Sequence, residues 1–219
     1  MINLLIDTTS WKKLISKTEV SKSLHQVSKW VKGNEVTLLC PAVLQEEWQK
    51  HREIELKVAK TSVIKAEKEV KLLGYMPGES QFQFALDLLQ SQISVADELF
   101  QMSVAIATPN SVLSNSADRQ LKQRPPFHNK KDSLKDCILI LTTIEYLHEK
   151  GQKELFFLSD NHNDFAVKND NGYQLNPDIL SNHPDMSVKY FRTSTELIEH
   201  LIKERHLSSL KADIDKVQS

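Results

Sequence analysis

The chain has 219 residues, a length that suits one α/β domain with an elaboration or at most two small domains. Apolar residues make up 40% of it, so a sizeable core can be buried, and 5 glycines with 7 prolines argue against a loop-rich or repeat fold. The formal net charge of -1 excludes a global attraction to nucleic acid, so any such binding has to come from a local patch.

The N-terminal segment, Met1 to Asp7, has no basic leader and no small-residue cleavage site, and no later segment approaches the length of a membrane span. The two cysteines, Cys40 and Cys137, lie far apart in sequence, each beside apolar residues. This pattern predicts buried thiols in a reducing compartment and makes a zinc site improbable. We therefore expect a cytoplasmic protein with no membrane interaction.

The N-terminal half alternates apolar strands with amphipathic helices. Two runs rich in Ile, Leu and Val are typical of buried parallel strands, and the helices around them keep apolar residues on one face. Pro41 stands where the first turn of a helix tolerates proline. The predicted order is a strand at 2–6, a helix capped within Thr8-Thr9-Ser10, a helix from about Val20 to Val31, a strand at 36–39, and a helix from Pro41 to about Leu72.

The middle of the chain is helical and polar. A second long amphipathic helix is predicted at about 80–107, and together with the helix before it looks like an insertion or lid on a simpler α/β core. Residues 108–131, rich in Ser, Asn, Pro and basic side chains, are predicted to form a long loop. We predict a single domain over 1–219, with a helical insertion at about 51–124 and a frayed tail from about 208.

The C-terminal half returns to alternation. A helix is predicted from Asp132 to about Lys150, strands at 155–158 and 188–191, and a last helix from Thr193 or Ser194 to about Arg205. Strands that alternate with helices predict an α/β fold with a parallel sheet of four to five strands flanked by helices. In such folds ligands bind at the carboxyl ends of the strands.

Acidic residues gather at that predicted edge. Asp7 ends the first strand, and Ser159-Asp160-Asn161, followed by Asp164, comes after the third. Two helices that begin near the same edge carry acids early, and these are Glu46, Glu47, Asp132 and Asp136. Hard divalent ions bind several carboxylate oxygens from different elements, and a two-metal site uses them to activate water and stabilise the leaving oxygen of a phosphodiester. The pattern therefore favours metal-dependent phosphodiester hydrolysis.

Each acid also has a simpler structural explanation. Asp7 could cap the following helix, although Thr9 and Ser10 suit that role better. Asp132 suits a helix N-cap as well as it suits a metal ligand. Asp136 lies in the first turns of a helix, where the helix dipole stabilises any carboxylate. Two choices remain open. One of Glu46 and Glu47 is expected to be only a solvated helix residue, and at least one of Asp160, Asn161 and Asp164 is expected to be only a turn residue.

Taken in order, these segments resemble a PIN domain. The matching motifs are Leu5-Ile6-Asp7-Thr8, Pro41 to Trp48 with the family's Glu on Glu47, Asp136-Cys137-Ile138-Leu139-Ile140, and Ser159 to Phe165. Pro125-Pro126-Phe127 and the strand at 189–192 are similar to a bacterial PIN-like subfamily of unclear function. The resemblance covers residues 1–50 and 125–205, and its specificity lies in the order and spacing of the motifs.

The resemblance implies a metal-dependent nuclease. The implied catalytic residues are Asp7, Glu47, Asp136 and Asp160, and the implied ligands of Mg²⁺ or Mn²⁺ are Asp7, Asp132, Asp136, Asn161 and Asp164. Asn161 stands where many members have Asp, so Asp160 or Asp164 could supply the missing charge, or the metal site could be weaker. We expect an endoribonuclease acting on single-stranded RNA, as a toxin or defence effector, with a homo-oligomer or a regulatory protein as conceivable assemblies.

Basic residues border the predicted acidic helix. The residues expected to hold the substrate are Lys122, Arg124, Lys130, Lys131 and Ser159. Phosphate contacts need only local charge of this kind, and the alternative is an ordinary solvated loop. His128 in the same stretch is expected to be a bystander.

Three other functions compete with this interpretation. A phosphatase with a nucleophilic aspartate after the first strand needs a second Asp two residues further on, where this chain has Thr9. The remaining alternatives are a DNA nuclease and a non-catalytic PIN-like module that binds nucleic acid or protein and has lost its metal.

Overall fold

The computed structural model of the chain describes residues 1–16, 18–72, 79–129, 133–170, 172–205 and 207. Its centre is a five-stranded sheet in the order β3-β2-β1-β4-β7, in which every neighbouring pair is parallel. The strands are β1 (Ile2–Ile6), β2 (Val36–Pro41), β3 (Val104–Ile106), β4 (Glu154–Leu158) and β7 (Ser187–Phe191). This confirms the predicted α/β fold with a parallel sheet flanked by helices.

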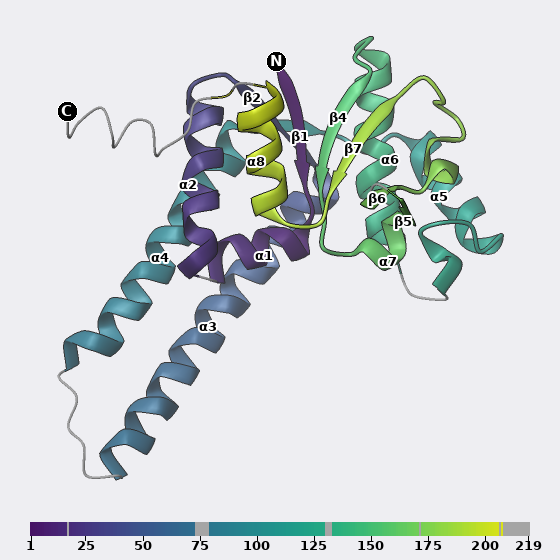
Figure 1. Cartoon of the computed structure of the whole chain (residues 1–219). Coiled ribbons are helices and arrows are strands. Elements are labelled where there is room, and N and C mark those ends of the chain that lie inside the picture. Colours follow the sequence, from purple (N-terminus) through teal and green to yellow (C-terminus); the bar gives the residue numbers. More distant parts are fainter. Residues whose placement is uncertain (17, 73–78, 130–132, 171, 206, 208–219) are drawn as a thin grey trace, which may run out of the picture.

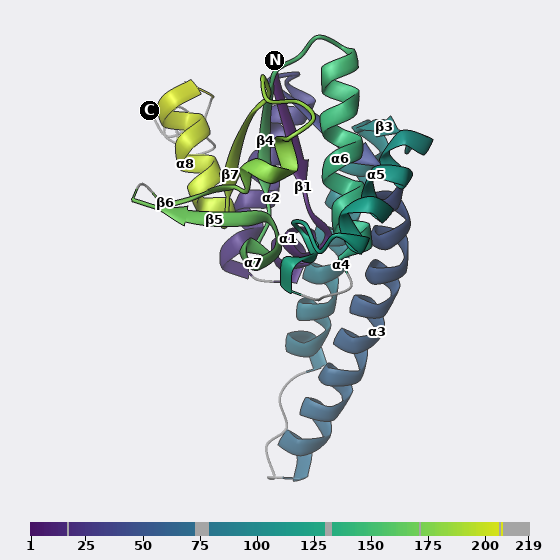
Figure 2. The same ribbon diagram turned by 90° about the vertical axis from the view of Figure 1, so that its right-hand side faces the viewer.

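Helices cover both faces of the sheet. Figures 1 and 2 show α2 and α8 on one face and α6 on the other, with α5 packed against α6. The long helices are α1 (Thr8–Ser16), α2 (Thr18–Lys32), α3 (Ala42–Leu72), α4 (Glu79–Met102), α5 (Asn110–Leu121), α6 (Leu134–Glu149) and α8 (Ser194–Arg205). Among the described residues no helix is both long and apolar enough to span a membrane.

The two central strands are the most deeply buried part of the sheet. Leu4 and Ile6 of β1 lie opposite Phe156 and Leu158 of β4, and these side chains are fully or almost fully buried. Strands that are covered on both faces need apolar residues at successive positions, which explains the unbroken apolar runs. Because β1 and β4 are adjacent and parallel, the residues that follow them meet at one edge of the sheet.

The predicted helix at 80–107 is too long. Helix α4 ends at Met102, and Val104–Ile106 form the edge strand β3, which pairs with Leu39–Pro41 of β2. A strand of three residues shows no period-two alternation, so its apolar side chains read as a continuation of the amphipathic helix. As a result, part of the stretch 51–124 belongs to the central sheet.

The predicted loop at 108–131 is wrong over half of its length, because residues Asn110–Leu121 form α5. The helix follows Pro109, which takes the N-cap position with an extended backbone. Its buried side chains are Val112, Ser116 and Arg119, so two of the three positions on its packed face are polar. Helical spacing carried by polar residues gives little hydrophobic periodicity, which is why the sequence pattern missed this helix.

Helices α3 and α4 form an antiparallel hairpin that projects from the domain (Figure 1). At its base Trp48 stacks on Phe100 with ring centroids 5.1 Å apart, and Phe100 also contacts Trp11 of α1. Asp97 accepts hydrogen bonds from Trp48 Nε1 at 2.8 Å and from Arg52 Nη1 at 2.6 Å. These contacts fix the first turns of α3 against the core.

A small antiparallel hairpin follows β4 and was not predicted. It consists of β5 (Ala166–Asn169) and β6 (Gly172–Leu175), and it is preceded by the short helix α7 (His162–Phe165). The 3₁₀ segments are η1 (Phe127–Asn129) and η2 (Pro177–Leu180). The predicted frayed tail from about 208 lies outside the described residues.

Candidate active site

Asp7 lies at the carboxyl end of β1 with its side chain only 2% exposed. Its Oδ1 accepts the backbone N–H of Ser10 at 2.7 Å, and its Oδ2 accepts the hydroxyls of Thr9 at 2.8 Å and Ser159 at 2.6 Å. Asp7 therefore caps α1, the role that the sequence pattern assigned to Thr9 or Ser10, while the bond to Ser159 ties it to the end of β4.

Burial raises the pKa of Asp7, against the hydrogen bonds from Ser10, Ser159 and Thr9, which lower it. The net direction is upward, because desolvation of the charged form outweighs the hydrogen bonds. An added positive charge at this position would restore the ionised form.

Asp136, in the first turn of α6, is the electrostatic centre of the site. Burial first, and then the negative charges of Asp7, Asp164 and Glu47, raise the pKa of Asp136 to about 7, although a hydrogen bond from Asn161 lowers it. These four carboxylates come from four different elements, namely the end of β1 and the helices α3, α6 and α7. They are close enough to repel one another, so we call Asp7, Glu47, Asp136 and Asp164 the acid cluster.

Asn161 bridges two members of the acid cluster. Its Nδ2 donates to Asp136 Oδ2 at 3.0 Å and to Asp164 Oδ2 at 2.8 Å. Asp164 is 1% exposed and also accepts the hydroxyl of Ser133 at 3.1 Å. The neutral amide thus holds two carboxylates together without adding a fifth negative charge.

Glu47 is the more solvated member of the cluster. It accepts the hydroxyl of Thr8 at 2.6 Å and the ammonium of Lys135 at 3.0 Å. Burial raises the pKa of Glu47, but the hydrogen bonds from Thr8 and Lys135 and the charge of Lys135 outweigh burial and hold the pKa below its usual value. These contacts belong to Glu47, the residue that the resemblance selected over Glu46.

Asp160 is turned away from the acid cluster. Its carboxylate forms an ion pair with Lys13 of α1, and its backbone N–H donates to Ser10 Oγ at 3.2 Å. The residues on either side, Ser159 and Asn161, bond to Asp7 and Asp136 instead. Side chains alternate in direction where an extended strand ends, so only every second residue of this segment reaches the cluster.

Of the residues predicted to hold the substrate, Ser159 bonds to Asp7, whereas the basic ones fall into three groups, the last of which shares its place outside the described residues with the predicted metal ligand Asp132. Arg124 binds the carboxylate of Asp178 through Nη2 and Nε, and the neighbouring Arg119 binds the same carboxylate at 2.9 Å. Lys122 pairs with Asp118 one turn earlier on α5 and remains 62% exposed. Three predicted residues, Lys130, Lys131 and Asp132, lie outside the described residues.

Several residues that support the site were missed from the sequence. Thr8 and Ser10 read as ordinary helix caps, and Ser133 and Lys135 as loop or helix-surface residues. Tyr190 of β7 donates its hydroxyl to the carbonyl of Ser159 at 2.6 Å, and burial raises the pKa of this tyrosine. The only available signal was position, because all of these residues stand within three places of an acid or a strand end.

The fit of a divalent ion depends on the oxygen donors of the acid cluster. Among the described residues no three His, Cys, Asp or Glu side chains converge closely enough to hold an ion directly. Neutral donors instead occupy part of the carboxylate oxygens, since Asn161 donates to Asp136 and Asp164 and Ser159 donates to Asp7. The crowding that raises the pKa of Asp136 nevertheless favours a cation, and Mg²⁺ commonly binds through one or two carboxylates while it keeps several waters. An ion that keeps several waters, such as Mg²⁺ or Mn²⁺, would therefore suit this donor set.

The fold and the site together define a parallel α/β domain with an acid cluster at the carboxyl edge of its sheet. A family model described as PIN domain matches residues 4–165, so the chain belongs to the PIN-domain family. Membership implies a nuclease that acts on nucleic acid, and PIN domains typically bind divalent metal ions. Neither the curated proteins nor the solved structures gave a match to the chain.

Proposed function

We propose that the chain is a Mg²⁺- or Mn²⁺-dependent endoribonuclease that hydrolyses single-stranded RNA. The observation that carries this proposal is the crowding of Asp7, Glu47 and Asp164 around Asp136, whose pKa is raised to about 7. The charges of three carboxylates around a buried fourth oppose folding unless a cation offsets them, so a functional role explains why they stand together. Lys135 pairs with Glu47 at 3.0 Å, yet the pKa of Asp136 remains raised, so this basic partner does not offset the crowding around Asp136.

Asp7, Asp136 and Asp164 would hold the metal in part through its bound waters, because the three side chains do not converge on one point, and Glu47 would lie beside them. When bound, the metal supplies an activated water for attack on phosphorus and offsets the charge that develops on the leaving oxygen. Ser10 and Ser159 keep Asp7 in position, and Asn161 sets the separation of Asp136 and Asp164. Glu47 can orient the attacking water by accepting a hydrogen bond from it, since its low pKa keeps it ionised near neutral pH.

The expected products carry a 5′-phosphate and a 3′-hydroxyl, because water is the nucleophile and the 3′ oxygen leaves. The test is incubation with labelled single-stranded RNA and DNA in Mn²⁺, in Mg²⁺ and in a chelator, with Asp136→Asn as the control enzyme. Cleavage of RNA in Mn²⁺ that is abolished by chelation and by the substitution supports the proposal. Cyclic phosphate products that persist in chelator would contradict it.

The second candidate is a non-catalytic PIN-like module that binds nucleic acid or protein. Asn161 favours this alternative, because a neutral amide bridges Asp136 and Asp164 where many family members have a further carboxylate. Titration of the metal-free protein with Mn²⁺ separates the two candidates. A module that has lost its metal should show no saturable site and no thermal stabilisation, whereas the nuclease should show both.

A further inference from the structure

A small pocket of about 230 Å³ lies beside the acid cluster. Its walls come from the start of α1, the end of β4 and the turn from β7 into α8, and its polar residues include Ser10, Lys13, Asp160, Arg192 and Ser194. Ser10 belongs to both sites, because its N–H donates to Asp7 Oδ1 while its Oγ accepts from the backbone of Asp160. The pocket therefore shares a wall with the candidate active site.

The charges in this pocket suit an anion. Lys13 and Arg192 supply two cations, and the one carboxylate of the lining, Asp160, is already paired with Lys13. The Lys13 and Asp160 side chains remain 46% and 38% exposed, so a ligand can reach the pair from solvent. An exposed ion pair of this kind is weak, so an incoming anion can replace the carboxylate at the ammonium.

Arg192 has unused capacity for an acceptor. Its guanidinium lies 4.4 Å from the centre of the Tyr173 ring, and its Nε is buried without a hydrogen-bond partner among the described residues. The backbone N–H groups of Arg192 and Thr193 are already bound by Glu196, at 3.0 and 3.3 Å. An anion would therefore be recognised by the side chains of Lys13 and Arg192 rather than by the end of α8.

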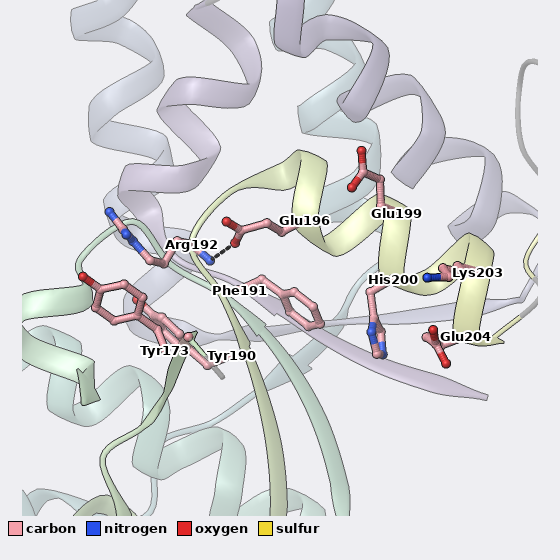
Figure 3. Close-up of a pocket in the computed structure, with 10 residues that line it drawn as sticks. Tyr173, Tyr190, Phe191, Arg192, Glu196, Glu199, His200, Lys203 and Glu204 are labelled. Atoms are coloured by element: carbon pink, nitrogen blue, oxygen red, sulfur yellow. Dashed lines mark hydrogen bonds between the residues drawn. The ribbon is translucent and has the colours of Figure 1, made fainter. Parts of the chain in front are cut away.

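A larger pocket of about 570 Å³ also includes Arg192 but has the opposite character (Figure 3). Glu196, Glu199 and Glu204 line it against Arg192 and Lys203, so carboxylates outnumber cations. A phosphate would be repelled there. The comparison selects the smaller pocket as the anion site.

On the proposed function, we propose that the smaller pocket binds a backbone phosphodiester of the substrate strand that neighbours the scissile one. The phosphate replaces Asp160 at the Lys13 ammonium and accepts a hydrogen bond from Arg192. Guanidinium and ammonium groups are the usual partners of phosphate oxygens, and such contacts position a strand without reading its sequence. Asp160 then keeps the pocket closed to weaker anions while no substrate is bound.

The test measures binding of single-stranded RNA oligonucleotides in chelator, so that hydrolysis plays no part. One linkage at a time is replaced by a neutral methylphosphonate. For wild type, neutralising one particular linkage should lower the affinity about tenfold, as expected for the loss of one charge-assisted contact. Lys13→Ala should bind the natural strand about tenfold more weakly and should no longer respond at that linkage. Asp160→Asn, which frees the ammonium, should bind more tightly than wild type.

The matched control is Lys32→Ala. Lys32 pairs with Glu98 at 2.8 Å, and the two side chains are 49% and 47% exposed, much like the pair of Lys13 and Asp160. Lys32 is the last residue of α2 and lies just before β2 begins, so it is near the amino ends of the strands, whereas the acid cluster lies at their carboxyl ends. Its substitution should leave both the affinity and the response to methylphosphonate unchanged.

Each outcome bears on the pocket. If Lys13→Ala binds as tightly as wild type and responds at the same linkages, the pocket is not a phosphate site. If the loss appears only with oligonucleotides that carry a terminal phosphate, the pocket reads a chain end and the backbone assignment is overturned. Hydrolysis in Mn²⁺ is measured separately. If wild type is active but Lys13→Ala binds RNA as wild type does, only the phosphate site is contradicted. If wild type is inactive but Lys13→Ala shows the expected loss of binding, only the nuclease function is contradicted. Absence of any oligonucleotide binding would remove both.

Discussion

The side-chain amide of Asn161 donates to the carboxylate of Asp136 across 3.0 Å, and these two residues lie 25 positions apart in the chain. The bond joins the turn after β4 to the first turn of α6. It also lowers the pKa of Asp136, against the larger effects of burial and of the charges around it. Asn161 therefore offsets part of the crowding at this edge in the metal-free protein.

Changing Asp136 to Asn should move stability and activity in opposite directions. The substitution removes the charge that Asp7, Glu47 and Asp164 repel, and it nearly preserves volume. We expect the metal-free protein to gain on the order of 1 kcal/mol at neutral pH, while hydrolysis falls by roughly 100-fold or more. Melting curves with and without Mn²⁺ check this, because the shift produced by Mn²⁺ should shrink. A clear loss of stability with an unchanged Mn²⁺ shift would remove Asp136 from the site.

The pH dependence of stability follows from the same group. Because the folded protein raises the pKa of Asp136 from 3.8 to about 7, its favourable contribution is complete below pH 4 and is lost as the pH rises through about 7. The difference in unfolding free energy between wild type and Asp136→Asn should therefore change by up to about 4 kcal/mol between pH 4 and pH 8, in favour of the variant at high pH. Urea titrations in chelator at several pH values measure it, and a difference independent of pH would contradict the raised pKa.

Changing Asn161 to Asp should have the reverse effect on stability. The substitution replaces a donor to Asp136 and Asp164 with a further negative charge. We expect the metal-free protein to lose about 2 kcal/mol at neutral pH and to gain a larger stabilisation from Mn²⁺. Calorimetric titration with Mn²⁺ should show tighter binding than in wild type. Unchanged metal affinity would mean that Asn161 does not face the ion.

Arg119 should matter for stability but not for chemistry. It is 1% exposed and donates to the carbonyl of Pro125, to the carboxylate and carbonyl of Asp178, and to Ser181. Replacing it with Met should cost about 3 kcal/mol of stability, because several partly buried acceptors, one of them charged, lose their donor. Hydrolysis per folded molecule should stay level. Lys122→Ala is the control, since an exposed pair one turn apart contributes less than about 0.5 kcal/mol.

The sheet and three members of the acid cluster were predictable, because Asp7 ends an apolar run and Glu47 and Asp136 stand early in helices that begin at the same edge. The sequence could not predict which of Asp160, Asn161 and Asp164 have side chains that face the cluster. This depends on the residue at which β4 ends, and a shift of one position would reverse which side chains face the cluster. Helix α5 and strand β3 were missed for another reason, since their packed faces are too polar or too short to leave a periodic pattern.

The aromatic contacts at the base of the α3–α4 hairpin have an optical consequence. Of the 3 tryptophans, Trp11 and Trp48 lie in one cluster with Phe100, with the two indole centroids 6.0 Å apart. Trp48 follows Glu47 directly, and Trp11 donates its backbone N–H to the carbonyl of Asp7. Indole emission responds to nearby charge and to the packing of neighbouring rings. The intrinsic fluorescence of the unlabelled protein should therefore follow the arrival of a cation or a strand at this edge in real time.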